Sequence, residues 1–267
     1  MKPSPLYVVG LGPGSGELLS PQALHALASC RAVAGYGAYL DLLPPELLEG
    51  RRLLRSGMRD EMERAGAALD AALAGEPTAL VCGGDPGVYA LAGLVFELAA
   101  ARGLSAADPP IEILPGIPAL CAAAALLGAP IGHDFACLSL SDLLTPWEVI
   151  EKRARCALAG DFALVIHNPR SAARDWQLAR VLDLAREARG GAGRLGLVKN
   201  ACRPGQRVLL SVLEAFDPAL ADMLSILFVG NSQSFFLPDG QGGLNWEKGA
   251  RLVTPRGYLA KYGSGTG

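Results

Sequence analysis

A strand, a glycine-rich turn and a helix follow one another in the middle of the first half of the chain, and this order constrains the fold most. Residues 78–82 form a short apolar run of strand length, and residues 90–102 have the apolar spacing of a helix. Between them, Gly83, Gly84 and Gly87 leave the backbone without Cβ atoms, so it can adopt positive φ and approach a ligand closely. The segment predicts either a ligand-binding loop or an ordinary strand-to-helix turn of an α/β protein.

The alternation of strands and helices continues along the chain. Strands are expected at residues 6–9, 32–35, 78–82, 111–114, 136–140, 161–166, 195–199, from 207 onward, and 224–229. Helices are expected at residues 20–30, 59–74, 90–102, 117–127, 145–157 and 175–189. This order predicts an α/β fold in which mainly parallel sheets are covered by helices on both faces.

The length of 267 residues exceeds what one ordinary hydrophobic core holds, so two lobes are expected. The prolines and glycine of Pro115-Gly-Ile-Pro118 interrupt the pattern near the middle of the chain. We therefore expect an N-terminal lobe at residues 1–115, a C-terminal lobe at residues 116–250 and a tail at residues 251–267.

The composition excludes several classes of protein. A net charge of -2 with a pI near 6.0 argues against a nucleic-acid binder, which needs a concentrated basic face. With 51% hydrophobic residues but no apolar run long enough to span a membrane, and no secretory signal, we expect a cytoplasmic protein without a membrane partner. The six cysteines and three histidines lack metal-ligand spacing, so no metal site is expected.

The glycines after the first strand do not form a nucleotide-binding motif. Residues 10–16 contain four glycines, but no G-x-G-x-x-G register fits and Pro13 lies inside the loop. The next strand ends in Tyr36, where a dinucleotide site would place an acid for the ribose hydroxyls. The chain also has no G-K-[ST], so neither a nicotinamide site nor a Walker phosphate loop is expected.

Polar clusters follow several of the expected strands of the second half. His167-Asn-Pro-Arg-Ser171 follows one strand, and Gly230-Asn-Ser232 follows the last strong one. Ligands of α/β sheets bind at the carboxyl ends of strands, so these clusters are expected to converge on one cleft.

Several motifs, in order and with similar spacing, resemble those of the tetrapyrrole methylase family. They are Gly12-Pro-Gly14, Gly83-Gly-Asp-Pro86, Pro115-Gly116 and the block from His133 to Trp147. Within this family, Ser139-Leu-Ser-Asp142, Asn168-Pro-Arg-Ser171 and Gly230-Asn-Ser232 resemble the precorrin-3B methyltransferases that act at ring carbon 17. Gly35-Tyr-Gly-Ala-Tyr39 departs from the family, because a lysine is expected there.

The resemblance implies a two-lobed α/β fold, a homodimer and S-adenosyl-L-methionine as cofactor. The implied cofactor contacts are Pro13, Gly83, Gly84, Asp85, Val88, Pro118, Ala119, Asn168 and Ala201. The implied substrate is a precorrin tetrapyrrole fringed with carboxylates, for which we expect contacts at Ser139, Arg170, Asn231 and Arg256. Nineteen of the 24 basic residues are arginine, which suits carboxylate recognition, although genomic base composition is the preferred explanation because the spacing of the arginines does not demand a ligand.

The implied reaction is methylation of precorrin-3B with ring contraction to precorrin-4, in cobalamin biosynthesis. Methyl transfer from a sulfonium needs alignment of the reacting atoms and no strong base. Ring contraction requires a hydroxyl to lose its proton, for which His133, Ser141 and Asp142 are the candidate catalytic residues, with His133 preferred because histidine is the commonest general base.

Other functions remain open from the sequence alone. The same fold is found in methylases of uroporphyrinogen III, precorrin-4 or cobalt-factor III, and in ribosomal RNA methylases, which should have a more basic surface. A non-enzymatic tetrapyrrole carrier would bind the macrocycle without S-adenosylmethionine.

Overall fold

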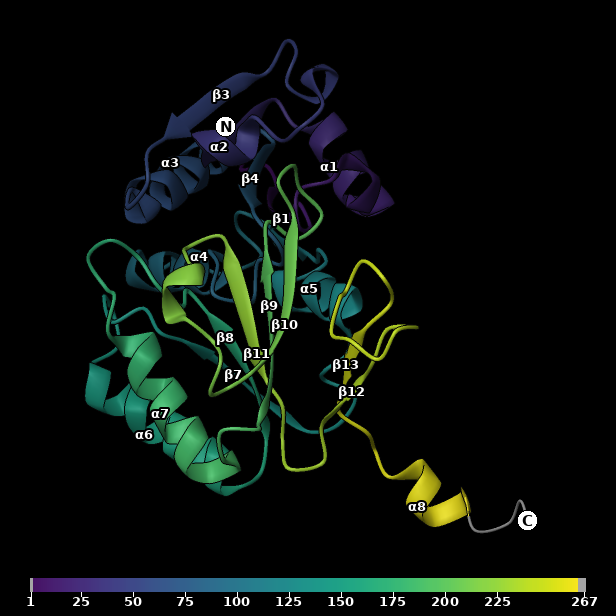
Figure 1. Ribbon diagram of the computed structural model, residues 1–267. Helices are drawn as coiled ribbons and strands as arrows, with labels where there is room; N and C mark the ends of the chain where they lie inside the picture. The colour runs from purple at the N-terminus through teal and green to yellow at the C-terminus, as the bar shows by residue number, and fades with distance from the viewer. Residues whose placement is uncertain (1, 264–267) are drawn as a thin grey trace. The chain divides into compact units, whose positions relative to one another are not determined.

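The computed structural model describes residues 2–263, and the chain divides into two compact units, residues 1–119 (unit 1) and residues 120–267 (unit 2). Each unit has a five-stranded sheet with its own hydrophobic core (Figure 1). The boundary falls a few residues beyond the expected end of the N-terminal lobe at residue 115. The expected tail begins with a strand, β13 (Arg251–Val253), which pairs with two other strands of unit 2.

Unit 1 is a parallel sheet between helices. Its elements are β1 (Leu6–Gly10), η1 (Gly16–Leu18), α1 (Pro21–Ser29), β2 (Ala32–Tyr36), α2 (Gly37–Leu40), η2 (Pro45–Leu47), β3 (Arg52–Ser56), α3 (Glu61–Leu73), β4 (Thr78–Cys82), α4 (Ala92–Ala101) and β5 (Ile111–Leu114). The strand order is β3-β2-β4-β1-β5, and every pairing is parallel. Because β1 and β4 lie at the centre, their carboxyl ends place the glycine loops side by side.

Local sequence signals set the helix boundaries of unit 1 where they were expected. The hydroxyl of Ser20 accepts a hydrogen bond of 3.1 Å from the Ala23 N–H and so caps α1, whose first residue is Pro21. Helix α3 ends before Gly75, which adopts a φ of 84° that an L-residue rarely takes. Alternate strand residues then face opposite cores: Val9 packs with α1, whereas Val8 packs with α3 and α4.

Unit 2 contains a second, mixed sheet. Its elements are α5 (Ala119–Leu127), β6 (Gly128–Ala129), β7 (Phe135–Ser139), α6 (Trp147–Ala159), β8 (Ala163–His167), α7 (Gln177–Arg189), β9 (Arg194–Lys199), β10 (Arg207–Val212), η3 (Pro218–Leu220), β11 (Ser225–Val229), β12 (Phe235–Leu237), β13 and α8 (Tyr258–Tyr262). The strand order is β10-β9-β11-β8-β7. Strands β12, β13 and β6 form a separate small sheet.

The expectation of a mainly parallel sheet is wrong for unit 2. Within the five-stranded sheet of the described residues, β7 and β8 alone pair in parallel, while the three pairings made by β8, β9, β10 and β11 are antiparallel. Parallel neighbours need a crossover of about a dozen residues or more, usually a helix. Residues 200–206 are too short for one, so β9 and β10 form a hairpin, and residues 213–224 contain only the short η3.

Helices α6 and α7 pack together against one face of the second sheet, where Leu164, Leu182 and Leu195 belong to one buried cluster. On β9, Gly196 lies between the cluster residues Leu195 and Leu197 and therefore faces the other way. A Cβ on Gly196 would lie 2.7 Å from the Leu127 side chain of α5, so this glycine allows α5 to approach the sheet. Across residues 2–263, no helix has the length and apolar character needed to cross a membrane.

Candidate functional site

In unit 1, the loops after β1 and β4 are joined through their backbones. Gly12 and Gly84 exchange two hydrogen bonds, of 3.1 Å from Gly12 N–H and 2.7 Å from Gly84 N–H. Both glycines have positive φ, 68° and 70° respectively, which most residues avoid. The two glycine-rich loops therefore form one rigid structure at the carboxyl edge of the parallel sheet.

A third loop, after β5, packs against the same two. A Cβ on Gly116 would lie 2.3 Å from the Gly84 carbonyl oxygen and 2.8 Å from the Gly10 carbonyl carbon. Such distances do not occur for real Cβ atoms, and backbone atoms cannot move aside as a flexible side chain can. Only glycine at 116 permits this contact among the three loops.

Asp85 fastens the glycine loop to the loop after β5. One carboxylate oxygen accepts a hydrogen bond of 2.8 Å from the Gly87 N–H, and the other accepts one of 3.1 Å from the Gly116 N–H. The side chain thus closes a local turn and also connects β4 to β5. A structural role for Asp85 is shown by these two bonds.

The expected cofactor residues of unit 1 lie together at this edge. A Cβ added to Gly84 would lie within 4 Å of backbone atoms of Pro118 and Ala119. Pro13 follows Gly12, and Val88 donates a hydrogen bond of 3.2 Å to the Asp85 carbonyl. Gly83 has a different reason to lack a side chain, because a Cβ there would lie 2.8 Å from the Tyr39 ring.

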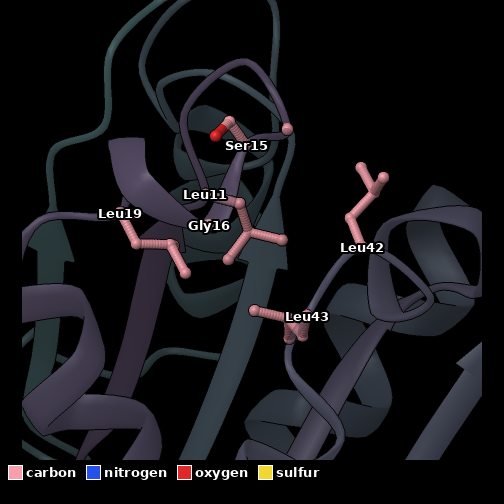
Figure 2. Close-up of a pocket in the computed structure, with 7 residues that line it drawn as sticks. Leu11, Ser15, Gly16, Leu19, Leu42 and Leu43 are labelled. Carbon is pink, nitrogen blue, oxygen red and sulfur yellow. The ribbon is translucent and has the colours of Figure 1, made fainter. Parts of the chain in front are cut away.

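Figure 2 shows a small depression beside this edge, between the loop after β1 and the segment after α2. The side chains of Leu11, Leu19, Leu42 and Leu43 border it, and Gly14, Ser15 and Gly16 complete its lining. Apolar walls and bare backbone are what a small neutral ligand group needs.

In unit 2, Ser139 connects the carboxyl ends of β7 and β8. Its hydroxyl accepts hydrogen bonds from the Asn168 side-chain amide at 2.9 Å and from the Ser141 N–H at 3.2 Å. Asn168 follows β8 directly and has a φ of 49°. The structure therefore brings Ser139, Ser141 and Asn168 together.

Arg174 and Gln177 extend this group, and sequence analysis did not select either of them. The buried Arg174 guanidinium donates a hydrogen bond to the Asn168 carbonyl, and its Nε lies 3.9 Å from an Asp142 carboxylate oxygen. Gln177 donates a hydrogen bond of 2.9 Å to the other Asp142 oxygen. Burial lowers the pKa of Arg174, and the charge of Asp142 acts in the opposite direction. The sequence showed only an arginine three residues after the expected ligand loop at residues 168–171, and gave no sign that it is buried.

Ala201 lies in the loop after β9, at the same edge of the second sheet. Its neighbours Asn200 and Cys202 have φ values of 49° and 58°. Non-glycine residues held in this region cost about 1–3 kcal/mol each and cluster at ligand-binding loops. The loop conformation agrees with a ligand contact at Ala201, which remains an expectation.

The expected convergence of all the polar clusters is wrong. β11 runs antiparallel to β8, so Asn231 and Ser232 follow β11 at the amino-terminal end of β8. There the Ser232 hydroxyl donates a hydrogen bond of 2.6 Å to Asp161. Asn231 therefore lies at the opposite edge of the sheet from Asn168.

His133 also lies at that opposite edge, so the structure does not bring it to Ser141 and Asp142. The carbonyl of its neighbour Asp134 accepts a hydrogen bond of 3.2 Å from the Ala163 N–H at the start of β8. Strand β7 separates this end from Ser139, a span of roughly 17–20 Å at 3.3 Å per residue. The His133 imidazole is exposed, with Nδ1 at 2.7 Å from the Asp134 N–H.

The two expected substrate arginines lie in different places. Arg170 is half-buried in the loop after β8, two residues beyond Asn168. Arg256 is exposed beyond β13, two residues after Thr254, whose hydroxyl donates a hydrogen bond of 2.7 Å to the Pro130 carbonyl. Only Arg170 is at the edge that carries Ser139 and Asn168.

His167, the last residue of β8, is buried behind this edge. Burial lowers its pKa from 6.5 to about 4, because the imidazolium form cannot be solvated there. The side chain is therefore neutral near pH 7.

Comparison with known proteins gives the family. A family model described as Tetrapyrrole (Corrin/Porphyrin) Methylases matches residues 5–217. The chain is 40% identical over 253 residues to a probable cobalt-factor III C(17)-methyltransferase of Salmonella typhimurium, covering 95% of this chain and 99% of that protein. It is 38% identical over 254 residues to a precorrin-3B C(17)-methyltransferase of Sinorhizobium sp, covering 95% and 96%.

A solved structure shows the same fold. The crystal structure of the methyltransferase CobJ superposes with a TM-score of 0.82 at 36% identity, covering 96% of this chain and 100% of that chain. The chain spans about half the length of two further relatives, 54% of one from Archaeoglobus fulgidus and 46% of one from Priestia megaterium. With most of its length matched by the family model and by relatives of similar size, this chain belongs to the tetrapyrrole methylases, a family of S-adenosylmethionine-dependent methyltransferases.

Proposed function

We propose that this enzyme methylates ring carbon 17 of precorrin-3B, or of cobalt-factor III, and contracts the macrocycle during cobalamin biosynthesis. The observation that carries the proposal is the similarity, over nearly the whole chain, to relatives named for these two substrates, at 38% and 40% identity. Precorrin-4 is the product expected from the metal-free substrate.

The loops of unit 1 fit S-adenosylmethionine, which supplies a methyl group on a positively charged sulfonium. Gly12 and Gly84 present backbone without side chains, and Asp85 holds the loops in place through two backbone N–H groups. No phosphate has to be bound, which agrees with the absence of a Walker or dinucleotide loop. We assign Pro13, Gly83, Gly84, Asp85, Val88, Pro118 and Ala119 to this site.

In unit 2, we propose Asn168 and Ala201 as cofactor contacts. Both lie in loops at one edge of the sheet, where Asn168 has a positive φ and Ala201 lies between two residues with positive φ. Arg174 fixes the Asn168 carbonyl and Ser139 fixes its side chain, so the loop needs little reorganisation on binding. Such fixed geometry is the main requirement for methyl transfer, because the reacting atoms must be aligned at about 3–3.5 Å.

For the proton transfer in ring contraction, we propose Asp142 or Ser141 before His133. Asp142 and Ser141 lie beside Ser139 and Asn168, whereas His133 lies at the other end of β7. A general base must come within hydrogen-bond reach of the proton that it removes. Ser139 and Arg170 remain the proposed substrate contacts at this edge. Asn231 and Arg256 lie elsewhere in unit 2, so they would have to contact a different part of the macrocycle.

We also propose that the enzyme is a cytoplasmic homodimer. The strand β12 supports self-association, because Phe235 and Leu237 are 41% and 54% exposed on an edge strand without charged residues. All six cysteines are free thiols, as is usual in a reducing compartment. Light scattering during size-exclusion chromatography should give twice the chain mass of 27.7 kDa, and a monomeric mass would contradict the dimer.

The activity is tested by supplying methyl-labelled S-adenosylmethionine with precorrin-3B or cobalt-factor III and analysing the product by mass spectrometry. One added labelled methyl group, at ring carbon 17 by NMR, is the expected result. Methylation of uroporphyrinogen III or precorrin-4 instead would contradict the proposed substrate. Calorimetric binding of a tetrapyrrole without any binding of S-adenosylmethionine would identify a carrier.

A further inference from the structure

Two leucines are displayed to solvent at the tip of the loop between β7 and α6. Leu143 is 71% exposed and Leu144 is 98% exposed, whereas neighbouring Leu138 and Leu140 are buried. Residues 142–146 are called the leucine loop below. A leucine that is exposed at this level gains no stability from burial within unit 2.

The leucine loop is held at both ends by the start of α7. At its first residue, Asp142 accepts a hydrogen bond of 2.9 Å from Gln177. Just beyond its last residue, the Trp147 ring packs edge-on against Trp176, with ring centroids 4.8 Å apart. Both ends of the loop are therefore held in place. Ordering the tip between them costs conformational entropy, and the exposed leucines make no burial within unit 2 that would offset this cost.

Two exposed apolar side chains and one half-buried arginine lie on the segments next to this loop, and the buried Arg174 lies beneath them. Trp176 is 51% exposed and Met223 is 46% exposed, and the Met223 sulfur accepts a hydrogen bond of 3.4 Å from Arg174. Arg170 is half-buried in the adjoining loop after β8. Apolar area beside arginine suits a ligand with a flat hydrocarbon face and a fringe of carboxylates.

We propose that Leu143 and Leu144 are substrate-binding residues that pack against the face of the tetrapyrrole macrocycle. This inference rests on the proposed function and assigns part of the substrate surface to the leucine loop. The placement at the edge that carries Ser139 and Asn168 favours the tetrapyrrole, since β7 and β8 pair in parallel and ligands lie at the carboxyl ends of parallel strands. S-adenosylmethionine is charged or polar along most of its length, so it is a poorer partner for two exposed leucines than a flat hydrocarbon macrocycle.

The test compares Leu143→Ser/Leu144→Ser with Leu259→Ser in the full chain. Leu259, on α8, is 85% exposed and serves as a control, because its exposure lies between those of Leu143 and Leu144 and its replacement removes a leucine elsewhere in unit 2. Turnover by the wild-type enzyme is measured first with precorrin-3B and cobalt-factor III, and its absence would contradict the proposed function itself. With the accepted tetrapyrrole, the double variant should raise KM by a factor of ten or more, which corresponds to about 1.4 kcal/mol.

Other measurements separate substrate packing from a general structural effect. The double serine variant should keep the wild-type Tm and the wild-type Kd for S-adenosylmethionine. Leu143→Met/Leu144→Met, which keeps the apolar side chains, should have a tetrapyrrole KM close to that of the wild type. An unchanged tetrapyrrole KM in the serine variant, with Tm also unchanged, would overturn the inference. An equal rise in KM for Leu259→Ser would overturn it as well.

Discussion

Gly84 and Gly116 both lack a side chain, but for different physical reasons. Gly84 needs its positive φ of 70°, and an added Cβ would meet nothing closer than 3.5 Å. We expect Gly84→Ala to lower the free energy of unfolding by about 1–2 kcal/mol and to weaken S-adenosylmethionine binding without abolishing it, because the packing of the three loops is kept. Gly116→Ala would force backbone atoms apart, so we expect a larger loss of stability together with loss of cofactor binding.

Urea unfolding and calorimetry with S-adenosylmethionine measure the two effects separately. Equal losses in the two variants would show that the backbone contact at Gly116 is not the determining feature. Gly93→Ala is a suitable control, because a Cβ there meets no atom within 4 Å and Gly93 lies in α4.

His167 should make the stability of the enzyme depend on pH. Its pKa is about 4 in the folded chain and near 6.5 when unfolded, so below pH 6.5 protons bind preferentially to the unfolded state. The free energy of unfolding should therefore fall as the pH drops from 6.5 toward 4, by about 2 kcal/mol at pH 5 from this group. His167→Gln removes the titration, and its unfolding free energy should fall less between pH 7 and pH 5. A parallel decline in the two proteins would contradict this assignment.

At the scale of elements, Arg174 connects α7 to the ends of β7 and β8. Its guanidinium holds the Asn168 carbonyl and lies beside Asp142. Arg174→Met should leave Asp142 without its buried cation and release the Asn168 loop, raising the Kd for S-adenosylmethionine at least ten-fold. Arg155→Met, which removes a more exposed ion pair with Glu151 on α6, is the control and should bind normally. A wild-type Kd for S-adenosylmethionine in Arg174→Met would contradict a positioning role for Arg174.

The sequence predicted those elements whose signals are local. The expected strands at residues 78–82 and 111–114 match β4 and β5, and the Ser20-Pro21 signal marks the start of α1. The short strands β6, β12 and β13 were missed because two or three residues carry no measurable alternation. The family, the enzyme class and the cofactor were confirmed by the comparisons.

The candidate site could be predicted only in part, because its geometry depends on strand direction. The grouping of Ser139, Ser141 and Asn168 follows from the parallel pairing of β7 and β8, which the alternating pattern implied. The misplacement of Asn231 follows from assuming that β11 is parallel as well. Periodicity gives the faces of a strand but not its direction, and only the length of the connections carried that information.

At the scale of the whole molecule, the two units have separate hydrophobic cores. Leu69 and Leu182 are both fully buried, the first in unit 1 and the second in unit 2. Each substitution to Ala should cost about 2–5 kcal/mol. Hydrogen exchange followed by mass spectrometry should show faster exchange mainly in the unit that carries the substitution. Equal acceleration in both units would mean that they unfold as one cooperative body.

The position of β11 bears on how the enzyme emerges from the ribosome. All five strands of the first sheet have been synthesised by residue 114. In the second sheet, β11 lies between β8 and β9, so these two strands cannot complete their pairing until β11, which ends at Val229, has been made. Once β8 and β9 have left the ribosome, and until β11 follows, the inner edges of two buried apolar strands are open to pairing with other nascent chains. Slow emergence of β11 therefore prolongs the stage of synthesis at which these two strands are exposed to such pairing.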